Sequence, residues 1–188
     1  MIISDATILI TLINIDEFRV LKLFVDKIII PYEVYDEVSQ KLSAKNFIDK
    51  EKALGFIDVQ DYQDKTIFNQ INYILDAGES ASITLALEKN LPLIIDEKKG
   101  RQFAQKQGIE IIGLVGILRF LYGNNQLSKK ETLSIVEKLN FSDFRISSSL
   151  VGVDIKSLTT PYTSQKFLRL KNFYNVKKKS TPTKKNLS

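Results

Sequence analysis

The sequence predicts an α/β domain with three layers, in which a parallel sheet lies between helices on both faces. Short apolar segments, several of them rich in isoleucine, alternate with longer segments whose apolar residues recur at helical spacing. Continuous apolar strands are typical of a parallel sheet that helices cover on both sides. Hydrophobic residues make up 44% of the 188 residues, enough for one domain to bury a core without disulfides. We therefore expect a single domain over residues 1–158 and a tail over residues 159–188.

The chain opens with a predicted strand. Residues 1–3 form a short apolar run that is closed by Ser4 and Asp5, as expected for a strand buried in a sheet. Helical spacing of apolar residues follows over residues 8–24, with a break expected near residues 14–16.

A second strand is predicted at residues 27–31, where three isoleucines are followed by Pro31. Proline has no amide proton, so it ends the strand and suits the first turn of the next helix. That helix is expected to turn Val34, Val38 and Leu42 toward the core.

The middle of the chain gives weaker patterns. Residues 43–75 favour a helix, a short strand around residues 56–59 and a second helix. The turn at residues 75–80 then opens a helix that continues to Lys89. Small side chains in this helix would let it lie close to the sheet.

The second half of the domain continues the alternation. A buried strand over residues 91–95 ends at Asp96, and a polar helix over residues 97–107 is closed by Gly108, which suits the left-handed position after a helix. A further strand is expected at residues 109–112. Helices are expected near residues 114–122, 129–139 and 147–158.

Composition excludes several kinds of active site. The chain contains no Cys and no His, which removes thiolate metal sites, cysteine nucleophiles, the serine-type triad and most transition-metal ligands. Any catalysis must therefore use carboxylates, hydroxyls, Lys or Arg. No apolar run approaches the about 20 residues that span a bilayer, and the first residues lack the basic segment of a secretory signal. We therefore expect a cytoplasmic protein with no membrane partner.

The net charge of +5 is unevenly distributed. Residues 1–154 carry 18 basic and 22 acidic residues, whereas residues 155–188 carry nine basic residues and no acid. An acidic body with a basic tail fits a polyanionic partner better than an evenly basic protein would. The alternative is that the lysine-rich end only keeps the chain solvated. The tail is expected to be partly disordered because Thr, Ser, Asn and Lys dominate it.

Four acids stand where parallel sheets carry their functional sites. Asp5 and Asp96 each follow a predicted strand directly, whereas Glu79 and Glu37 lie on predicted helices. The carboxyl ends of parallel strands share one edge of the sheet, so these side chains could meet there. Taken singly, each has an ordinary alternative, as a helix cap for the two aspartates, a partner of the helix dipole for Glu79 and a solvated residue for Glu37.

The chemistry of such a cluster is restrictive if the four carboxylates meet. Clustered carboxylates repel one another, so some must hold a proton or a cation must neutralise them. Without His or Cys, oxygen ligands favour Mg²⁺ or Mn²⁺ over zinc. Such an ion keeps bound waters and binds phosphate oxygens, which is the apparatus for metal-assisted hydrolysis of a phosphodiester.

Four stretches, taken in order, resemble the PIN-domain nucleases, in particular the VapC-type ribonuclease toxins and a related PIN-like branch. Each stretch contains one of the acids, and their order and spacing agree over residues 1–150. The stretches are ISDAT at residues 3–7, IPYEVYDEV at 30–38, LDAGESASI at 75–83 and LIIDEKKGR at 93–101, and the likeness continues through residues 112–118.

The resemblance implies a PIN-like parallel sheet and a metal-dependent endoribonuclease that cuts RNA internally. It also implies that the protein is the toxin of a toxin–antitoxin pair, with a small cognate antitoxin protein as partner. The acidic quartet that would hold Mg²⁺ or Mn²⁺ consists of Asp5, Glu37, Glu79 and Asp96.

Other residues are assigned supporting roles by the same resemblance. Thr7 matches a position where a small hydroxylated residue supports the first acid, although a helix cap explains it equally well. Glu97 stands where a second acid is common, and it is either a further metal ligand or a residue of the first helical turn. Lys98 and Arg101 could reach substrate phosphates, with solvated helix charges as the simpler alternative.

The tail lies outside the resemblance, and its aromatic residues alternate with basic ones. Such a mixture is able to stack on bases and to contact phosphates. The tail could equally pack on a second copy of the chain in a homodimer. The basic tail residues that could bind RNA are Lys166, Arg169, Lys171, Lys177, Lys178 and Lys179.

Two other functions fit the sequence less well. A catalytically silent PIN-like domain could bind RNA or a protein through its basic tail, although a decayed site would be expected to lack at least one acid. A phospho-receiver domain is also an α/β fold with an acidic pocket. It needs two adjacent acids after the first strand, and here Ser4 precedes Asp5.

Overall fold

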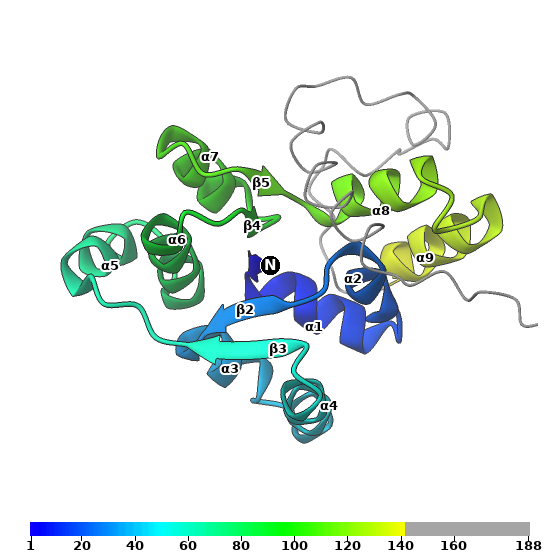
Figure 1. Cartoon of the computed structure of the whole chain (residues 1–188), viewed down its shortest axis with the longest axis horizontal. Coiled ribbons are helices and arrows are strands. Elements are labelled where there is room, and N and C mark those ends of the chain that lie inside the picture. The colour runs from blue at the N-terminus through cyan, green and yellow to red at the C-terminus, as the bar shows by residue number, and fades with distance from the viewer. Residues whose placement is uncertain (142–188) are drawn as a thin grey trace, which may run out of the picture.

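A computed structural model describes residues 1–141 of the chain (Figure 1). Its five strands are β1 (Ile2–Ser4), β2 (Ile28–Pro31), β3 (Ile57–Gln60), β4 (Leu93–Ile94) and β5 (Ile111–Ile112). Its helices are α1 (Ala6–Asn14), α2 (Arg19–Phe24), α3 (Tyr32–Val38), α4 (Leu42–Ala53), α5 (Lys65–Asn72), α6 (Ala77–Lys89), α7 (Lys98–Lys106), α8 (Leu114–Gly123) and α9 (Lys129–Phe141).

All five strands pair in parallel, in the order β3-β2-β1-β4-β5. The central strand β1 pairs on both sides, because Ile3 is opposite Ile29 of β2 and also opposite Leu93 of β4. In chain order, β2 and β3 lie on one side of β1, and β4 and β5 lie on the other side. The order therefore reverses between β1 and β4, and in open α/β sheets the crevice at the carboxyl ends of such strands is the usual ligand site.

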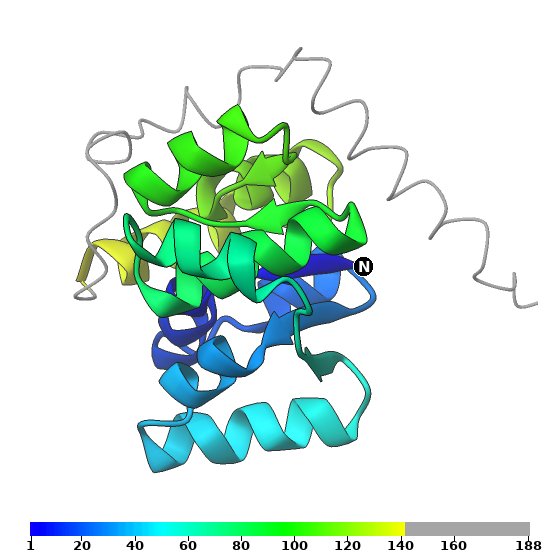
Figure 2. The same cartoon turned by 90° about the vertical axis from the view of Figure 1, so that its left-hand side faces the viewer.

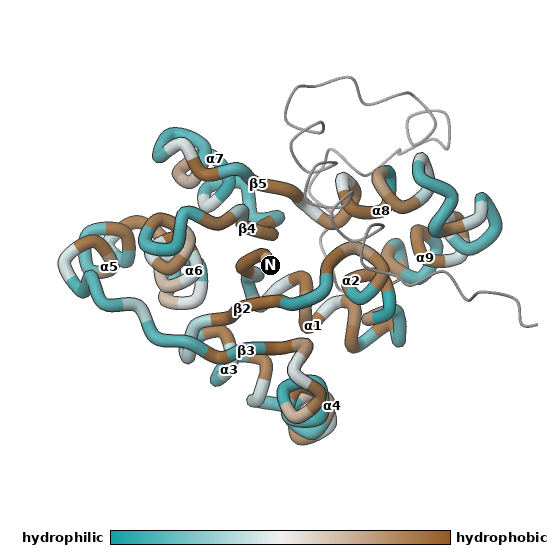
Figure 3. The backbone as a smooth tube through the Cα atoms, in the orientation of Figure 1, coloured by the Kyte–Doolittle hydropathy of each residue, from teal (hydrophilic) through white to brown (hydrophobic). Residues whose placement is uncertain are grey.

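The strands bury both of their faces. One set of side chains, including Ile2, Ile28 and Ile94, packs in a core with α1, α2, α8 and α9, while the other set, including Ile3 and Leu93, packs with α5, α6 and α7. Figure 1 shows these two groups of helices on opposite sides of the sheet, and Figure 2 looks onto the α5–α6 side. Figure 3 shows that β1 and β2 are hydrophobic and that most of α7 is hydrophilic. The predicted three-layer α/β fold is confirmed.

The break predicted near residues 14–16 is also found, because Asp16 has a φ of 56° between α1 and α2. The prediction that Leu42 faces the core is wrong, since this side chain is 73% exposed. Helix α3 ends at Val38, and the extended backbone of Lys41 starts α4 in a new phase.

Strands β4 and β5 are shorter than predicted, because each begins two residues later than expected and β4 also ends one residue earlier. Pro92 cannot donate a backbone hydrogen bond, and its carbonyl accepts one from the Ile3 amide before β4 begins. Within residues 1–141, no helix combines the length and the apolar character needed to cross a membrane. The helix predicted at residues 147–158 and the tail from residue 159 lie outside the described residues.

Candidate metal centre

The four predicted acids lie around the carboxyl edge of the sheet, at the place where the strand order reverses. Asp5 follows β1 directly, and Asp96 comes two residues after β4. Glu37 lies in the last turn of α3 and Glu79 in the first turn of α6, and these two helices pack against each other. The fold thus brings α3 and α6 together beside β1 and β2, because α3 packs on β2 and α6 packs on both strands.

Asp5 is a buried carboxylate with an unused oxygen. Its side chain is 2% exposed, and Oδ2 has no hydrogen-bond partner among residues 1–141. Asp5 occupies the N-cap position of α1, but its side chain makes no capping hydrogen bond. The pKa of Asp5 is raised to about 7, first by burial and then by the charges of Asp76 and Glu37, while hydrogen bonding by the Ala6 amide and the Thr7 hydroxyl opposes the rise.

Glu79 is the second buried carboxylate with an unused oxygen. Its side chain is 4% exposed, and Oε1 has no hydrogen-bond partner in the described part of the chain. Burial raises the pKa of Glu79 to about 8, with further contributions from the charges of Asp76, Asp5 and Glu97. The two acids therefore share one region in which negative charge is disfavoured.

Two glycines make room for the acids. A Cβ atom on Gly78 would stand 2.9 Å from Oε2 of Glu37, and one on Gly100 would stand 2.9 Å from Oε1 of Glu79. Real Cβ atoms essentially never come so close, so a side chain at Gly78 would displace the Glu37 carboxylate. A side chain at Gly100 would displace Ile95, whose Cδ1 would stand 2.6 Å from the Cβ atom, as well as the Glu79 carboxylate. Glu37 is half-buried, and burial and the charge of Asp76 raise its pKa.

Asp76 is a fifth acid of the cluster that was not predicted from the sequence. It is the N-cap of α6, where its Oδ1 accepts a hydrogen bond of 2.8 Å from the Glu79 amide. Its charge raises the pKa of Asp5, Glu37 and Glu79 alike. The signal in the sequence was an aspartate followed three residues later by a glutamate at the start of a helix, which is the spacing of a capping box.

Asp96 has a hydrogen-bond partner on α8 and a charge partner on α7. Its Oδ2 accepts a hydrogen bond of 2.9 Å from the Leu114 amide, and its Oδ1 lies 3.7 Å from a guanidinium nitrogen of Arg101. Burial raises the pKa of Asp96, while the Leu114 amide and the Arg101 charge lower it. The groups that act on this carboxyl thus belong to α7 and α8 rather than to the acid cluster.

The remaining predicted residues have simpler surroundings. Glu97 is exposed and caps α7, because its Oε2 accepts hydrogen bonds from the amides of Lys99 and Gly100. Lys98 is an exposed residue at the start of α7. The tail residues assigned to RNA binding, from Lys166 to Lys179, lie outside the described residues.

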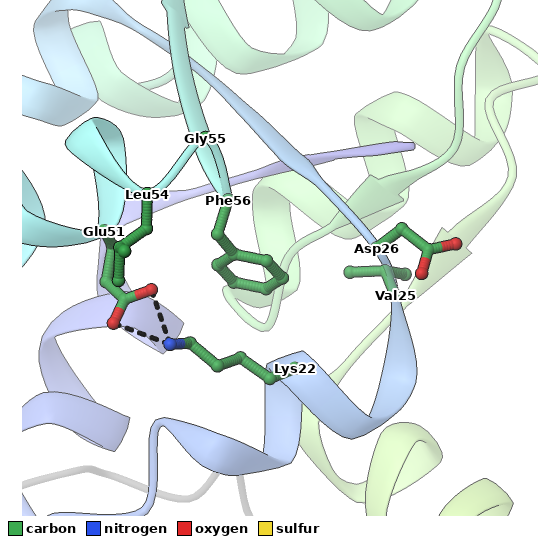
Figure 4. Close-up of a pocket in the computed structure, with 7 residues that line it drawn as sticks. All are labelled: Lys22, Val25, Asp26, Glu51, Leu54, Gly55 and Phe56. Carbon is green, nitrogen blue, oxygen red and sulfur yellow. Dashed lines mark hydrogen bonds and ion pairs between the residues drawn. The ribbon is translucent and has the colours of Figure 1, made fainter.

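Two hollows in the surface lie at the opposite, amino edge of the sheet. One, of about 300 Å³, stands in front of β2 and β3, where Lys22 Nζ reaches across to both carboxylate oxygens of Glu51 at 2.7 Å (Figure 4). The other, of about 320 Å³, stands in front of β4 and β5 and is lined by residues such as Pro92 and Ile109. Neither hollow is lined by an acid of the cluster at the carboxyl edge.

Comparison with known proteins supports the family suggested by the sequence. A family model described as a PIN domain matches residues 1–159. The chain belongs to the PIN-domain family. PIN domains are in general nucleases, and these nucleases use divalent metal ions. No curated protein and no solved structure gives a significant match.

The acids of this PIN domain fit a hard divalent cation. Among the residues that the structure describes, Asp5 Oδ2 and Glu79 Oε1 are buried oxygens without hydrogen-bond partners, and a cation would lower the raised pKa of both carboxyls. Within residues 1–141, no three acidic side chains stand in an arrangement that could hold a metal ion as they are. Binding would therefore draw side chains together or leave several waters on the ion, as Mg²⁺ commonly does.

Proposed function

We propose that this PIN domain is an endoribonuclease that depends on Mg²⁺ or Mn²⁺ and hydrolyses internal phosphodiester bonds of RNA. The observation that carries the proposal is a pair of buried carboxylate oxygens, Asp5 Oδ2 and Glu79 Oε1, beside the point where the strand order reverses. Neither oxygen has a hydrogen-bond partner within residues 1–141. A folded protein keeps such oxygens without partners at a cost, which a bound cation would offset.

In the proposed site, Asp5 and Glu79 hold the ion, and Glu37 stands beside them on α3. A bound divalent ion supplies a water of lowered pKa and stabilises negative charge that develops on phosphate oxygens. The chain has no His and no Cys, so a carboxylate of the cluster is the candidate for proton transfer. Burial of Asp5 and Glu79 keeps these ligands away from bulk water, which strengthens their attraction for a cation.

The metal-free cluster would hold protons near neutral pH, since the pKa of Asp5 is about 7 and that of Glu79 about 8. Loading the ion would therefore release protons, and the affinity for metal would rise with pH over this range. Asp76 holds the start of α6 through the Glu79 amide and adds negative charge to the cluster.

The biological role we propose is that of the toxin in a toxin–antitoxin pair that acts in the cytoplasm. The support is the likeness of residues 1–150 to VapC-type toxins, together with membership of the PIN-domain family. A small antitoxin protein would then bind the domain and block cleavage. Expression of the chain alone should arrest growth of a bacterial host, and Asp5→Asn should relieve the arrest.

Cleavage of a mixed pool of RNA tests the enzymatic proposal. We expect internal cuts with millimolar Mn²⁺, no cuts after chelation, and recovery when Mn²⁺ is restored. Product ends without 2′,3′-cyclic phosphate would indicate attack by water rather than by the ribose 2′-hydroxyl. RNA that is bound but left intact under all these conditions would refute the proposal and favour the catalytically silent alternative.

A further inference from the structure

Tyr73 is the most exposed of the large hydrophobic residues within residues 1–141. It is 95% exposed, although Ile71 and Leu75 on either side of it are buried in the core that α5 and α6 share. The core therefore fixes this turn of the chain while the ring of Tyr73 stays in solvent. Single exposed hydrophobic residues are common on protein surfaces, so the place and the neighbours of this ring decide whether it has a function.

Tyr73 stands beside the acid cluster. It follows the last residue of α5, and Asp76, whose charge raises the pKa of the three nearby cluster acids, comes three residues later. Three peptide units keep the Cα atoms of Tyr73 and Asp76 at most about 11 Å apart. Helix α6, which begins after this turn, contacts both α5 and α7 (Figure 1). A base next to a phosphate at the cluster would therefore lie within reach of the Tyr73 ring.

Two amide side chains share the helical face of Tyr73. Asn69 and Gln70 are exposed and lie four and three residues before it, and Tyr73 itself keeps helical dihedrals, with φ −70° and ψ −20°. Residues at these spacings are neighbours on a helix surface, so the ring and the two amides form one patch, which we call the Tyr73 patch. No charged residue occurs from residue 66 to residue 75. An aromatic face with uncharged donors and acceptors beside it suits a nucleic-acid base better than a phosphate.

Positive side chains lie at another border of the cluster. Lys98 and Lys99 are exposed at the start of α7. They precede Gly100, where a Cβ atom would stand 2.9 Å from Oε1 of Glu79. The acid cluster thus has lysines near Glu79 and an uncharged aromatic patch near Asp76. Lysines bind phosphates without regard to sequence, whereas aromatic and amide groups contact bases, so the two borders suit the two parts of a nucleotide.

We propose that the Tyr73 patch binds an unpaired base of single-stranded RNA, next to the phosphate at the acid cluster. The ring of Tyr73 stacks on the base, and the amides of Asn69 and Gln70 contact its edge. Only a base outside a duplex offers its face to such a ring, so the patch selects single-stranded RNA. The inference rests on the proposed function in taking RNA as the substrate, and it names the class of RNA. The competing explanation is a protein that docks on Tyr73, because tyrosine is also enriched in protein interfaces.

A fluorescent reporter gives the first arm of the test. The chain contains no Trp, so Tyr73→Trp places a single indole in the patch. A single-stranded RNA of about 12 nucleotides, added with chelator so that it stays intact, should quench the indole fluorescence by stacking, and the same sequence in a duplex should quench it much less. Leu54→Trp, at an exposed position of the hollow at the amino edge, is the control and should not be quenched. No quenching at position 73, or equal quenching by single strand and duplex, would overturn the inference.

Binding and cleavage by ring variants give the second arm. Tyr73→Ala should weaken binding of the single strand about fivefold or more, whereas Tyr73→Phe, which keeps the ring, should stay within about twofold. In cleavage assays Tyr73→Ala should raise KM and leave kcat nearly unchanged, because stacking is equal in the ground state and the transition state. The melting temperature should not change, since this residue is 95% exposed. If Tyr73→Ala binds and cleaves RNA like the parent, the ring does not contact RNA, and the protein-docking explanation is favoured.

Base preference tests the two amides. Asn69→Ala and Gln70→Ala should each change the ratio of the Kd values for oligouridine and oligoadenylate by at least about threefold, because amides bond differently to the edges of different bases. Asn72→Ala is the matched control, because Asn72 is also exposed but directly precedes Tyr73 and so lies on a different face of the helix. An unchanged ratio in both test variants would contradict the role of the amides.

This inference and the proposed function can fail separately. If single-stranded RNA quenches the reporter of Tyr73→Trp but the parent cuts no RNA with Mn²⁺, the endoribonuclease proposal fails and the Tyr73 patch stands as a base-binding surface. If the parent cuts RNA and neither the reporter nor Tyr73→Ala responds as expected, the patch is not a base-binding surface and the endoribonuclease proposal stands. If the parent neither binds nor cuts RNA, both are wrong.

Discussion

Replacing Asp5 by asparagine should stabilise the metal-free protein at high pH. The pKa of Asp5 is raised from 3.8 to about 7, first because the side chain is buried and then because Asp76 and Glu37 carry negative charge nearby. A carboxyl with a raised pKa favours the folded state while it holds its proton. Its contribution to stability is therefore complete below about pH 4 and is lost as the pH rises through about 7. Asparagine carries no charge at pH 4 or at pH 7, so the Asp5→Asn variant does not lose stability as the pH rises.

The size of the effect follows from the shift in pKa. About three pKa units correspond to about 4 kcal/mol, which is an upper limit because the Asp5 charge also raises the pKa of Glu79 and the two effects overlap. We expect Asp5→Asn to gain about 1–3 kcal/mol of unfolding free energy at pH 8 and less than about 0.5 kcal/mol at pH 4.

Urea unfolding with chelator at pH 4 and pH 8 measures this gain, and Asp36→Asn, an exposed acid on α3, serves as the matched control. The control should change by less than about 0.5 kcal/mol at both pH values. A gain for Asp5→Asn that is equal at both pH values, or a loss at pH 8, would refute the reasoning from buried charge.

Three further outcomes are expected. Mn²⁺ at a hundredfold excess over its Kd should stabilise the parent by about 2.7 kcal/mol, which is measured as a higher melting temperature, and should stabilise Glu79→Gln much less. An equal rise in the melting temperature of both proteins would show that the ion binds elsewhere. Gly100→Ala should destabilise by about 1–2 kcal/mol in urea unfolding, although alanine usually stabilises a helix, because the new Cβ would stand 2.6 Å from Ile95 Cδ1 and 2.9 Å from Glu79 Oε1. Deleting residues 176–188 removes five lysines and should flatten the plot of log RNA affinity against log salt by about 2–3 units while leaving folding unchanged; an unaltered slope would show that these lysines do not contact phosphate.

The sequence was sufficient to predict the fold class and the place of the acids in the chain. Asp5 and Asp96 each follow an apolar run that is typical of a strand buried on both faces, as in a parallel sheet. Strands that pair in parallel end at the same edge of the sheet, so both aspartates were expected at that edge. The error at Leu42 arose because residues 39–41 carry no strong helix-breaking signal, and the helical phase was continued through them.

The direction in which each acid points could not be predicted from spacing. Asp96 turns to α8 because Gly113 leaves room for its oxygen and Arg101 supplies a charge, and both residues act through contacts that exist only after folding. Asp76 was overlooked for the opposite reason. Its capping role was readable from the sequence, but its closeness to Asp5 and Glu37 depends on how α6 meets β1 and α3.

The most direct test of the acid cluster as a catalytic centre is the cleavage rate of one RNA at saturating Mn²⁺, compared between the parent, Asp5→Asn, Glu79→Gln and Asp36→Asn. The two cluster variants should be slower by at least about 100-fold, because each removes a charge that holds the ion, while the exposed Asp36→Asn control keeps the parent rate. Cleavage by Asp5→Asn and Glu79→Gln at the parent rate would contradict the account and place the chemistry away from this edge of the sheet.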